Sequence, residues 1–264
     1  MKPVPYLSHC PDADGVVRYS EAEHAIWAEL QARQSAAIAA HACDEFRHGL
    51  DRLQLPADRI PQLAEVSARL RRETGWEVAA VPALIPFSEF FALLAARRFP
   101  AATFIRRREH LDYLQEPDIF HELYGHAPLL TDPDFAAFTE GYGRMGLAAS
   151  KEDRVFLARL YWFTVEFGLL RRPGGGLAIY GGGILSSPGE TAWAMSPAPL
   201  LKPFELIEVL RTPYRIDLLQ PQYFVLDRLR DLQALTRVDL LAAIAEARRL
   251  GLHPPLFPPK PLAA

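Results

Sequence analysis

The chain has 264 residues, of which 50% are hydrophobic and 23% are charged, and its formal net charge is -3. This is the composition of an ordinary globular protein, and the length suits one domain with a well-buried core. The lack of a basic surplus argues against a nucleic-acid partner, and no apolar run has the length of a membrane span, so a small-molecule partner is expected.

The two cysteines, Cys10 and Cys43, belong to no closely spaced metal or redox motif. Such sparse usage is typical of a reduced compartment rather than of a disulfide scaffold. The N-terminus shows no basic and then apolar leader. We therefore expect a soluble cytoplasmic protein.

Prolines and a glycine indicate an extended N-terminal arm over residues 1–17, which either packs on the domain or stays loose. Residues 18–264 are expected to form one domain. A capping box of Ser20 and Glu23, followed by apolar residues at helical spacing, predicts helical structure to about residue 53, as one helix or as two.

Proline in the first turn and glycine as terminator predict a helix over residues 61–74. Further helices are expected over residues 88–98, from about residue 132, and from about residue 151. The last of these is apolar almost all round between residues 155 and 170, so it should lie inside the protein.

Glycine is frequent over residues 173–189, where short apolar pieces at 177–180 and 184–185 indicate a small hairpin or loops with unusual backbone angles. A phosphate-binding loop is excluded, because no Gly-Lys-Ser/Thr follows. The remaining elements expected are a helix over residues 203–211, an extended piece over 214–219 and a closing helix over 239–250. The predicted class is mainly α with a small β component.

His121 and His126 flank Glu122 in a segment that suggests one half of a metal site. Five positions on a regular helix turn two side chains about 140° apart, too far to share one face. We therefore expect the helix to end near Gly125, so that His126 swings back beside His121 from the loop. The alternative is a pair of helix-end histidines that bond to carbonyl groups.

Glu166 lies among apolar residues and would supply a third ligand. Since Glu152, Arg159 and Glu166 recur every seven residues, the alternative is one solvated stripe on a helix. An ionised carboxylate buried without a partner is costly, however, and a divalent metal can offset that cost. Two histidines and one carboxylate with open positions are the ligands of non-haem iron(II) oxygenases, which makes oxygen chemistry the leading hypothesis.

Two other classes of function stay open. The first is a zinc-dependent hydrolase that uses the same His/His/Glu site, although the fifth position of the peptidase pattern that begins at His121 is Gly125 instead of histidine. The second is a helical binding module whose histidines are structural.

Four strings of sequence, at residues 116–128, 161–168, 180–190 and 220–223, resemble the pterin-dependent aromatic amino acid hydroxylases, most closely the short bacterial phenylalanine 4-hydroxylases. The resemblance implies the single-domain catalytic fold of that family. It also implies an oxidoreductase, a monooxygenase of phenylalanine catabolism that converts L-phenylalanine to L-tyrosine with O2. The implied cofactors are two: iron(II), which is Fe(2+), and a tetrahydropterin, either tetrahydrobiopterin or a related reduced pterin.

The resemblance assigns roles to individual residues. It implies that His121, His126 and Glu166 hold the iron(II) and that Phe90 and Glu122 contact the pterin. Without it, Phe90 would be interpreted as part of the core.

The substrate site that the resemblance implies contains Arg106, Pro117, Trp162, Ser186 and Ser187. Arg106 would clamp the carboxylate of the amino acid with a planar fork, although as one of three adjacent arginines it would otherwise be interpreted as a solvated basic turn. Ser186 would also hydrogen-bond the first histidine ligand.

Two positions, Trp162 and Ile216, bear on which aromatic amino acid is the substrate, and a comparison with the animal enzymes bears on the oligomeric state. Tryptophan-hydroxylating relatives carry phenylalanine at the position of Trp162, and tyrosine-hydroxylating relatives carry aspartate at the position of Ile216, so both residues favour phenylalanine. The chain lacks the regulatory domain and the coiled-coil extension of the animal enzymes. We therefore expect a monomer without allosteric control by phenylalanine.

Overall fold

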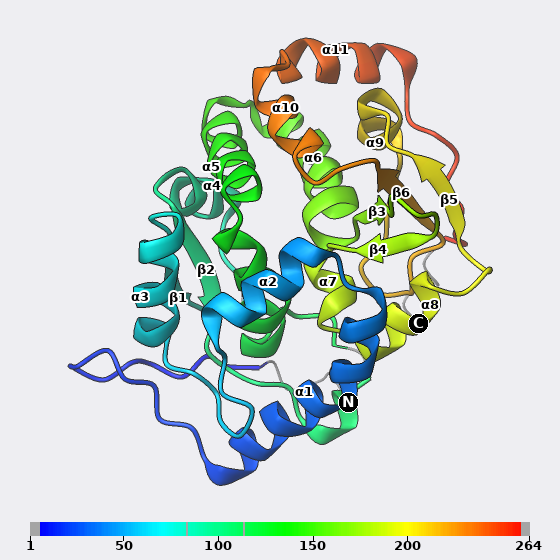
Figure 1. Cartoon of the computed structure of the whole chain (residues 1–264). Coiled ribbons are helices and arrows are strands. Elements are labelled where there is room, and N and C mark those ends of the chain that lie inside the picture. The colour runs from blue at the N-terminus through cyan, green and yellow to red at the C-terminus, as the bar shows by residue number, and fades with distance from the viewer. Residues whose placement is uncertain (1–5, 83, 113, 260–264) are drawn as a thin grey trace.

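The structure is a computed structural model that describes residues 6–82, 84–112 and 114–259. Helices make up most of this part of the chain, and a two-stranded and a four-stranded sheet form its β component (Figure 1). The predicted class, mainly α with a small β component, is confirmed. Among the described residues, no helix combines the length and the apolar character that a membrane crossing requires.

The N-terminal helices are α1 (Glu21–His41), α2 (Asp44–Leu53) and α3 (Leu63–Glu73). The capping box of Ser20 and Glu23 is present, and the helical structure predicted to residue 53 is confirmed as two helices. The break lies at Ala42 and Cys43, where the backbone is extended and the Cys43 N–H donates to the Ile179 carbonyl at 2.9 Å. A contact with a distant strand thus decides where α1 ends.

A parallel pair of strands surrounds the next helix in the order β1 (Glu77–Val81), α4 (Phe87–Ala95), β2 (Arg98–Ala102). The helix predicted over residues 88–98 is therefore too long at its end. Arg97 has a positive φ of 57°, which ends the helix, and Arg98 begins a strand. Neither strand is expected from the sequence, because each is short and pairs only with a segment beyond the intervening helix.

The middle of the chain carries the predicted metal segments. Its elements are η1 (Arg108–His110), η2 (His121–His126), η3 (Ala127–Thr131), α5 (Pro133–Ala148), α6 (Lys151–Tyr161) and η4 (Trp162–Glu166). The expectation of an interior helix to residue 170 is wrong in two respects. Val155 on α6 is 51% exposed, and the helical structure ends at Glu166, after which a strand begins at Leu169.

The four-stranded sheet has the order β4-β3-β6-β5. Its strands are β3 (Leu169–Arg171), β4 (Leu177–Ile179), β5 (Leu200–Pro203) and β6 (Gln222–Leu226). The unusual backbone angles expected in the glycine-rich region are confirmed at Gly175 and Gly176, which have φ of 91° and 83° in the turn between β3 and β4. The predicted hairpin is right in one strand only, because β4 pairs with β3, in the stretch expected to be helical, and not with residues 184–185. The apolar piece at residues 184–185 is helical, however, so it is not part of a hairpin. The helix predicted over residues 203–211 is present but begins only at Leu206, because Pro203 belongs to a strand.

The C-terminal third contains α7 (Gly182–Leu185), α8 (Pro188–Ala194), α9 (Leu206–Arg211), α10 (Asp231–Ala234), η5 (Leu235–Arg237) and α11 (Leu240–Leu250). The closing helix is confirmed, with the Asp239 side chain as its N-cap. The extended piece expected over residues 214–219 is a loop, and the strand begins only at Gln222.

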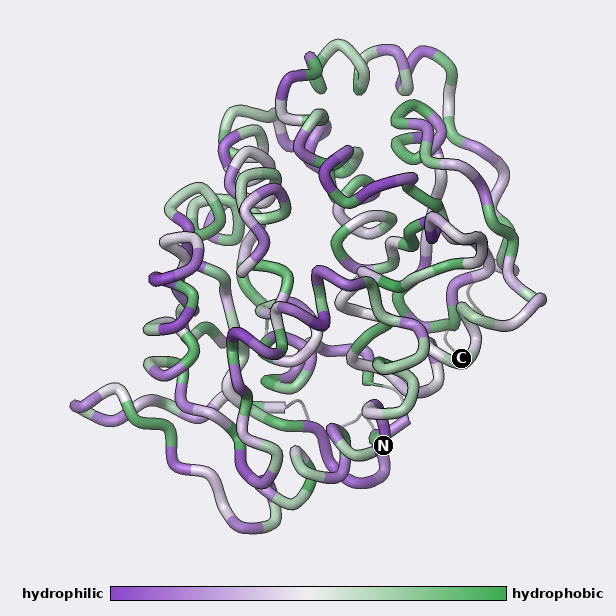
Figure 2. Tube along the Cα trace, in the orientation of Figure 1, coloured by the Kyte–Doolittle hydropathy of each residue, from purple (hydrophilic) through white to green (hydrophobic). Residues whose placement is uncertain are grey.

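An aromatic cluster in the core holds η2 from its apolar side. The Phe120 ring stacks on Tyr124 with centroids 4.7 Å apart, and Trp27 packs edge-on against Phe120 at 5.3 Å. Figure 2 shows hydrophobic and hydrophilic residues alternating along the peripheral helix α3, which buries one side only. Burying one side of η2 in this way leaves its histidines on the other side.

The described part of the N-terminal arm packs on the domain. The Tyr6 ring stacks on Phe104 with centroids 4.8 Å apart, and Ser8 Oγ donates to the Val81 carbonyl and accepts from the Thr103 N–H, each at 3.1 Å. Of the two expectations for the arm, the packed one holds for these residues. Residues 1–5 lie outside the described part of the chain.

Replacing Gly49 by alanine should destabilise the protein by about 1–3 kcal/mol, the usual cost of overpacking. A Cβ atom at Gly49 would lie 2.1 Å from the carbonyl oxygen of Pro128, in the segment that directly follows the second histidine. Gly174→Ala is the matched control, because nothing lies within 4 Å of a Cβ atom there. Urea denaturation measures both, and equal midpoints for the two variants would contradict this account.

Candidate metal centre and active site

The two candidate ligand histidines, His121 and His126, share one face because η2 is a π-helical turn. The Ala127 N–H donates to the Glu122 carbonyl, five residues back, so the turn is wider than an α-helical one. Residues five apart then lie almost above one another, which brings His126 beside His121. The expectation that the helix ends at Gly125 is wrong, since the helical backbone continues through this residue.

The third candidate ligand also sits on a π-helical turn. In η4 the Phe167 N–H donates to the Trp162 carbonyl at 2.9 Å, again five residues back. The turn carries Glu166 inward, and its side chain is only 15% exposed. The alternative interpretation, that Glu166 belongs to a solvated stripe with Glu152 and Arg159, is therefore wrong.

The donor atoms of the three side chains converge. His121 Nε2 and His126 Nε2 lie 2.9 Å apart, and Glu166 Oε2 lies 3.5 Å from the first and 3.3 Å from the second. Two ligands bound at about 2.1 Å to one ion, at angles between square and tetrahedral, are about 3.0–3.4 Å apart. The set thus fits a metal ion, and the three residues could hold one.

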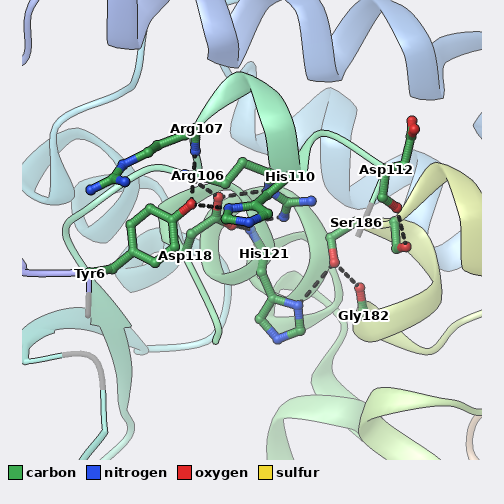
Figure 3. A network of polar contacts seen from close by, with 10 residues as sticks. Tyr6, Arg106, Arg107, His110, Asp112, Asp118, His121, Gly182 and Ser186 are labelled. Carbon is green, nitrogen blue, oxygen red and sulfur yellow. Dashed lines mark hydrogen bonds and ion pairs between the residues drawn. The ribbon is translucent and has the colours of Figure 1, made fainter. Parts of the chain in front are cut away.

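Ser186 determines which nitrogen of His121 carries the proton. Its hydroxyl has one hydrogen, which it donates to the Gly182 carbonyl at 2.8 Å. At His121 Nδ1, 2.9 Å away, the same oxygen must then accept, so the proton is on Nδ1 (Figure 3). The lone pair of Nε2 is consequently free to face the metal position, as a ligand histidine requires.

Glycines in α7 and η2 allow the backbone to approach the candidate ligands closely. A Cβ atom at Gly182 would lie 2.4 Å from the His126 ring, and one at Gly125 would lie 2.6 Å from the Gly182 carbonyl oxygen. Unusual backbone angles, expected in this glycine-rich region, occur at Gly175 and Gly176 in the hairpin turn. Gly182 is needed for another reason, because a side chain there would collide with the His126 ring.

Two buried carboxyl groups near this point have opposite protonation tendencies. Burial opposes ionisation of Glu166, but His126 and His121 hold its pKa well below the usual value. Burial raises the pKa of Glu122 to about 8, with the charge of Glu166 adding to this and that of His121 opposing it. Glu166 is thus ionised at neutral pH, as a metal ligand must be, and Glu122 can carry a proton there.

Two cavities meet at the candidate metal site. The Arg106 cavity has a volume of about 330 Å³, and the Phe90 cavity has about 220 Å³. Both are lined by His121 and Glu166. The Arg106 cavity contains every predicted substrate residue, namely Arg106, Pro117, Trp162, Ser186 and Ser187, and also Ile216. The Phe90 cavity contains the two predicted pterin residues, Phe90 and Glu122.

Arg106 is 3% exposed, so its interpretation as a solvated basic turn is wrong. Its Nε and Nη2 donate to the two carboxylate oxygens of Asp118 at 2.8 and 2.9 Å, which leaves Nη1 outside this pair (Figure 3). Asp118 also accepts from the His121 N–H at 2.9 Å. Burial opposes its ionisation, yet the Arg106 charge and these hydrogen bonds hold its pKa below the usual value.

Sequence reasoning missed Asp118 and Tyr214. Asp118 lies within the string at residues 116–128, and its position directly before apolar Ile119 is the signal that could have shown it to be buried. The Tyr214 ring stacks on the Trp162 indole with centroids 4.4 Å apart. No local pattern marks that contact, because it joins residues far apart in the chain.

Comparison with known proteins agrees with this geometry. The model of the family described as biopterin-dependent aromatic amino acid hydroxylase matches residues 11–243. A phenylalanine-4-hydroxylase of Pseudomonas aeruginosa is 57% identical over 263 residues, which is 100% of both chains. The solved structure of the cold active phenylalanine hydroxylase from Colwellia psychrerythraea 34H is 57% identical, with a TM-score of 0.92 and coverage of 95% of this chain and 97% of that chain. The Chromobacterium violaceum phenylalanine hydroxylase structure with bound oxidized Fe(III) is 43% identical, with a TM-score of 0.87 and coverage of 93% and 89%.

Ser186→Ala should weaken metal binding by about 10- to 100-fold, the typical cost of losing a hydrogen bond to a ligand histidine. The reason is that His121 Nδ1 loses its acceptor, so the ring is free to rotate and to change tautomer. Titration of the metal-free protein with iron(II) under anaerobic conditions, followed by the bound fraction, measures the affinity without turnover. Ser196→Ala is the control, because its hydroxyl bonds the Trp193 carbonyl instead. Equal affinities of the two variants would exclude this role for Ser186.

Proposed function

The chain belongs to the family of biopterin-dependent aromatic amino acid hydroxylases, and we propose that it converts L-phenylalanine to L-tyrosine with O2, iron(II) and a tetrahydropterin. The observation that carries the proposal is the meeting of two cavities at the His121 and Glu166 side chains, whose donor atoms lie together with that of His126. One cavity has the residues expected to hold an amino acid and the other those expected to hold a flat heterocycle. The zinc hydrolase alternative gains no support, since each relative named above is a phenylalanine hydroxylase.

We propose that His121, His126 and Glu166 hold the iron(II) through Nε2, Nε2 and Oε2. When bound, the ion and the reduced pterin would together activate O2 for insertion into an aromatic ring, with the pterin supplying two electrons. The protein supplies the ionised Glu166 carboxylate and a His121 ring whose proton Ser186 keeps on Nδ1.

Arg106 is proposed to bind the carboxylate of the substrate. Asp118 holds the guanidinium in the cavity wall through Nε and Nη2, so Nη1 is left for an incoming anion. Pro117 and Trp162 then flank the substrate ring, and Ile216 at the cavity wall offers no polar atom to a phenolic hydroxyl. This set favours phenylalanine over tyrosine, because a hydroxyl buried against apolar atoms without a partner is costly.

Phe90 and Glu122 are proposed to bind the pterin. Phe90 is half-buried on α4, and its ring packs edge-on against Tyr161 at 5.4 Å, an orientation that holds it at the cavity wall. Glu122, with its pKa near 8, can either donate or accept a hydrogen bond at the edge of the pterin ring.

The proposal extends to organisation and location. We propose that residues 18–264 form the catalytic domain and that residues 1–17 form an N-terminal arm; the contacts of Tyr6 and Ser8 support packing of its described part on the domain. We also propose a cytoplasmic location, because both cysteines are free and Cys43 is buried without a partner for a disulfide. A monomer stays a prediction, which light scattering of the iron-loaded protein can check.

Iron-loaded protein, tetrahydropterin and air should convert phenylalanine to tyrosine, identified by mass and retention time. Tyrosine and tryptophan are tested in parallel, and phenylalanine should be preferred. Glu166→Gln should lose both stoichiometric iron and turnover, because its neutral amide is a poor metal ligand. A fully ferrous wild-type protein that stays inert toward phenylalanine would overturn the proposed function.

Phe90→Ala should raise the KM for pterin by about three- to tenfold, the worth of one aromatic contact, and leave the KM for phenylalanine nearly unchanged. Phe156→Ala is the control, because this ring packs under Arg159 at 4.8 Å and lines neither cavity. Steady-state kinetics with each substrate varied in turn measures both constants. An unchanged pterin KM in Phe90→Ala would exclude its assigned role.

A further inference from the structure

Gln220 is a buried residue with a hydrogen bond at every side-chain group, and nothing above assigns it a role. It is 2% exposed. Its Oε1 accepts from the Trp162 indole N–H at 2.9 Å, and its Nε2 donates to the carbonyls of Arg215 and Leu218, each at 2.9 Å. One amide therefore joins the indole to the loop on either side of Ile216.

The backbone of Gln220 extends the same connection to α8. Its N–H donates to Glu190 Oε1 at 3.1 Å, and its carbonyl accepts from the Trp193 indole at 2.8 Å. Glu190 is 1% exposed and lines the Arg106 cavity. Three segments that wall this cavity, carrying Trp162, Glu190 and Ile216, are thus all bonded to one residue or to the loop that it holds.

The indole of Trp162 needs such a partner to have one orientation. Tyr214 stacks on it at 4.4 Å with an interplanar angle of 15°, and Phe167 contacts it at 4.4 Å. Stacking restrains the tilt of a ring but leaves it free to slide or turn in its own plane. A hydrogen bond at the N–H is directional and removes that freedom.

We propose that Gln220 is a positioning residue for substrate discrimination, acting through the Trp162 indole and the loop that carries Ile216. This rests on the proposed function, because the discrimination concerns which aromatic amino acid the Arg106 cavity accepts. With Gln220 in place the cavity has one shape, sized for a phenyl ring. Without Gln220, the Trp162 indole can shift in its own plane, and tryptophan, which is larger, then competes better with phenylalanine for the Arg106 cavity.

The test is the ratio of kcat/KM for phenylalanine to kcat/KM for tryptophan in Gln220→Met. Methionine has a similar length and no comparable hydrogen bond. The ratio should fall about fivefold, the effect of one lost hydrogen bond. Inactive or misfolded protein lowers the kcat/KM for phenylalanine and the kcat/KM for tryptophan by the same factor, so a purely structural loss does not move their ratio. If the wild type does not hydroxylate tryptophan at all, the appearance of hydroxylated tryptophan with the variant also counts as a fall of the ratio.

Gln222→Met is the matched control, because Gln222 is 3% exposed two positions further on and does not line the Arg106 cavity. Its ratio should equal that of the wild type. In a Trp162→Phe background, which lacks the indole N–H, Gln220→Met should shift the ratio less than in the wild type. If Gln220→Met proves too unstable to assay, Gln220→Glu is measured instead. It keeps an acceptor for the indole and loses the amide donors to the loop, so the ratio should fall below that of the wild type by less than fivefold. A wild-type ratio in Gln220→Glu would then overturn the inference.

The inference is overturned if an active Gln220→Met protein keeps the wild-type ratio, or if Gln222→Met shows the same fall. It is also overturned if the fall is undiminished in the Trp162→Phe background. A wild-type enzyme that does not hydroxylate phenylalanine would instead overturn the proposed function, so the two failures are distinguishable.

Discussion

Three electron-pair donors face one another inside this protein, and the rest of the site is arranged around that constraint. His121 Nε2, His126 Nε2 and Glu166 Oε2 lie 2.9 to 3.5 Å apart with the histidine side chains 17% and 2% exposed. Such a group is unfavourable in a protein interior unless a cation lies between the donors. Two π-helical turns bring the donors to one point, and Gly182 allows the His126 ring to fit against the backbone.

Asp118 connects the metal side of the site to the substrate side. It binds the Arg106 guanidinium with both oxygens and the His121 N–H with one of them. A buried carboxylate with a bidentate arginine and a backbone donor is fully compensated, and breaking such a pair is far more costly than never forming it. The group proposed to hold the substrate carboxylate and the first candidate metal ligand therefore share one anchor, so neither can shift alone.

The two cavities divide the chemistry between them. The Arg106 cavity has a charged end and aromatic and apolar walls, which suit an amino acid with a flat apolar side chain. The Phe90 cavity offers a ring face and a carboxyl group of raised pKa, which suit a polar heterocycle. Since both open onto His121 and Glu166, two ligands can approach one ion from different sides. The hydrogen bonds of Gln220 connect the Trp162 and Glu190 walls of the Arg106 cavity to a residue behind them.

The sequence by itself determined the helix starts at Ser20 and Asp239 and the three residues that the structure brings together, because caps and ligand types are local properties of the chain. It also carried the family resemblance, which long strings of residues encode. Only the tertiary structure decided that η2 and η4 are π-helical, that β1 pairs with β2, and that Arg106 is buried on Asp118. These features depend on contacts between segments far apart in the chain, and no pattern of neighbouring residues specifies which distant atoms will meet.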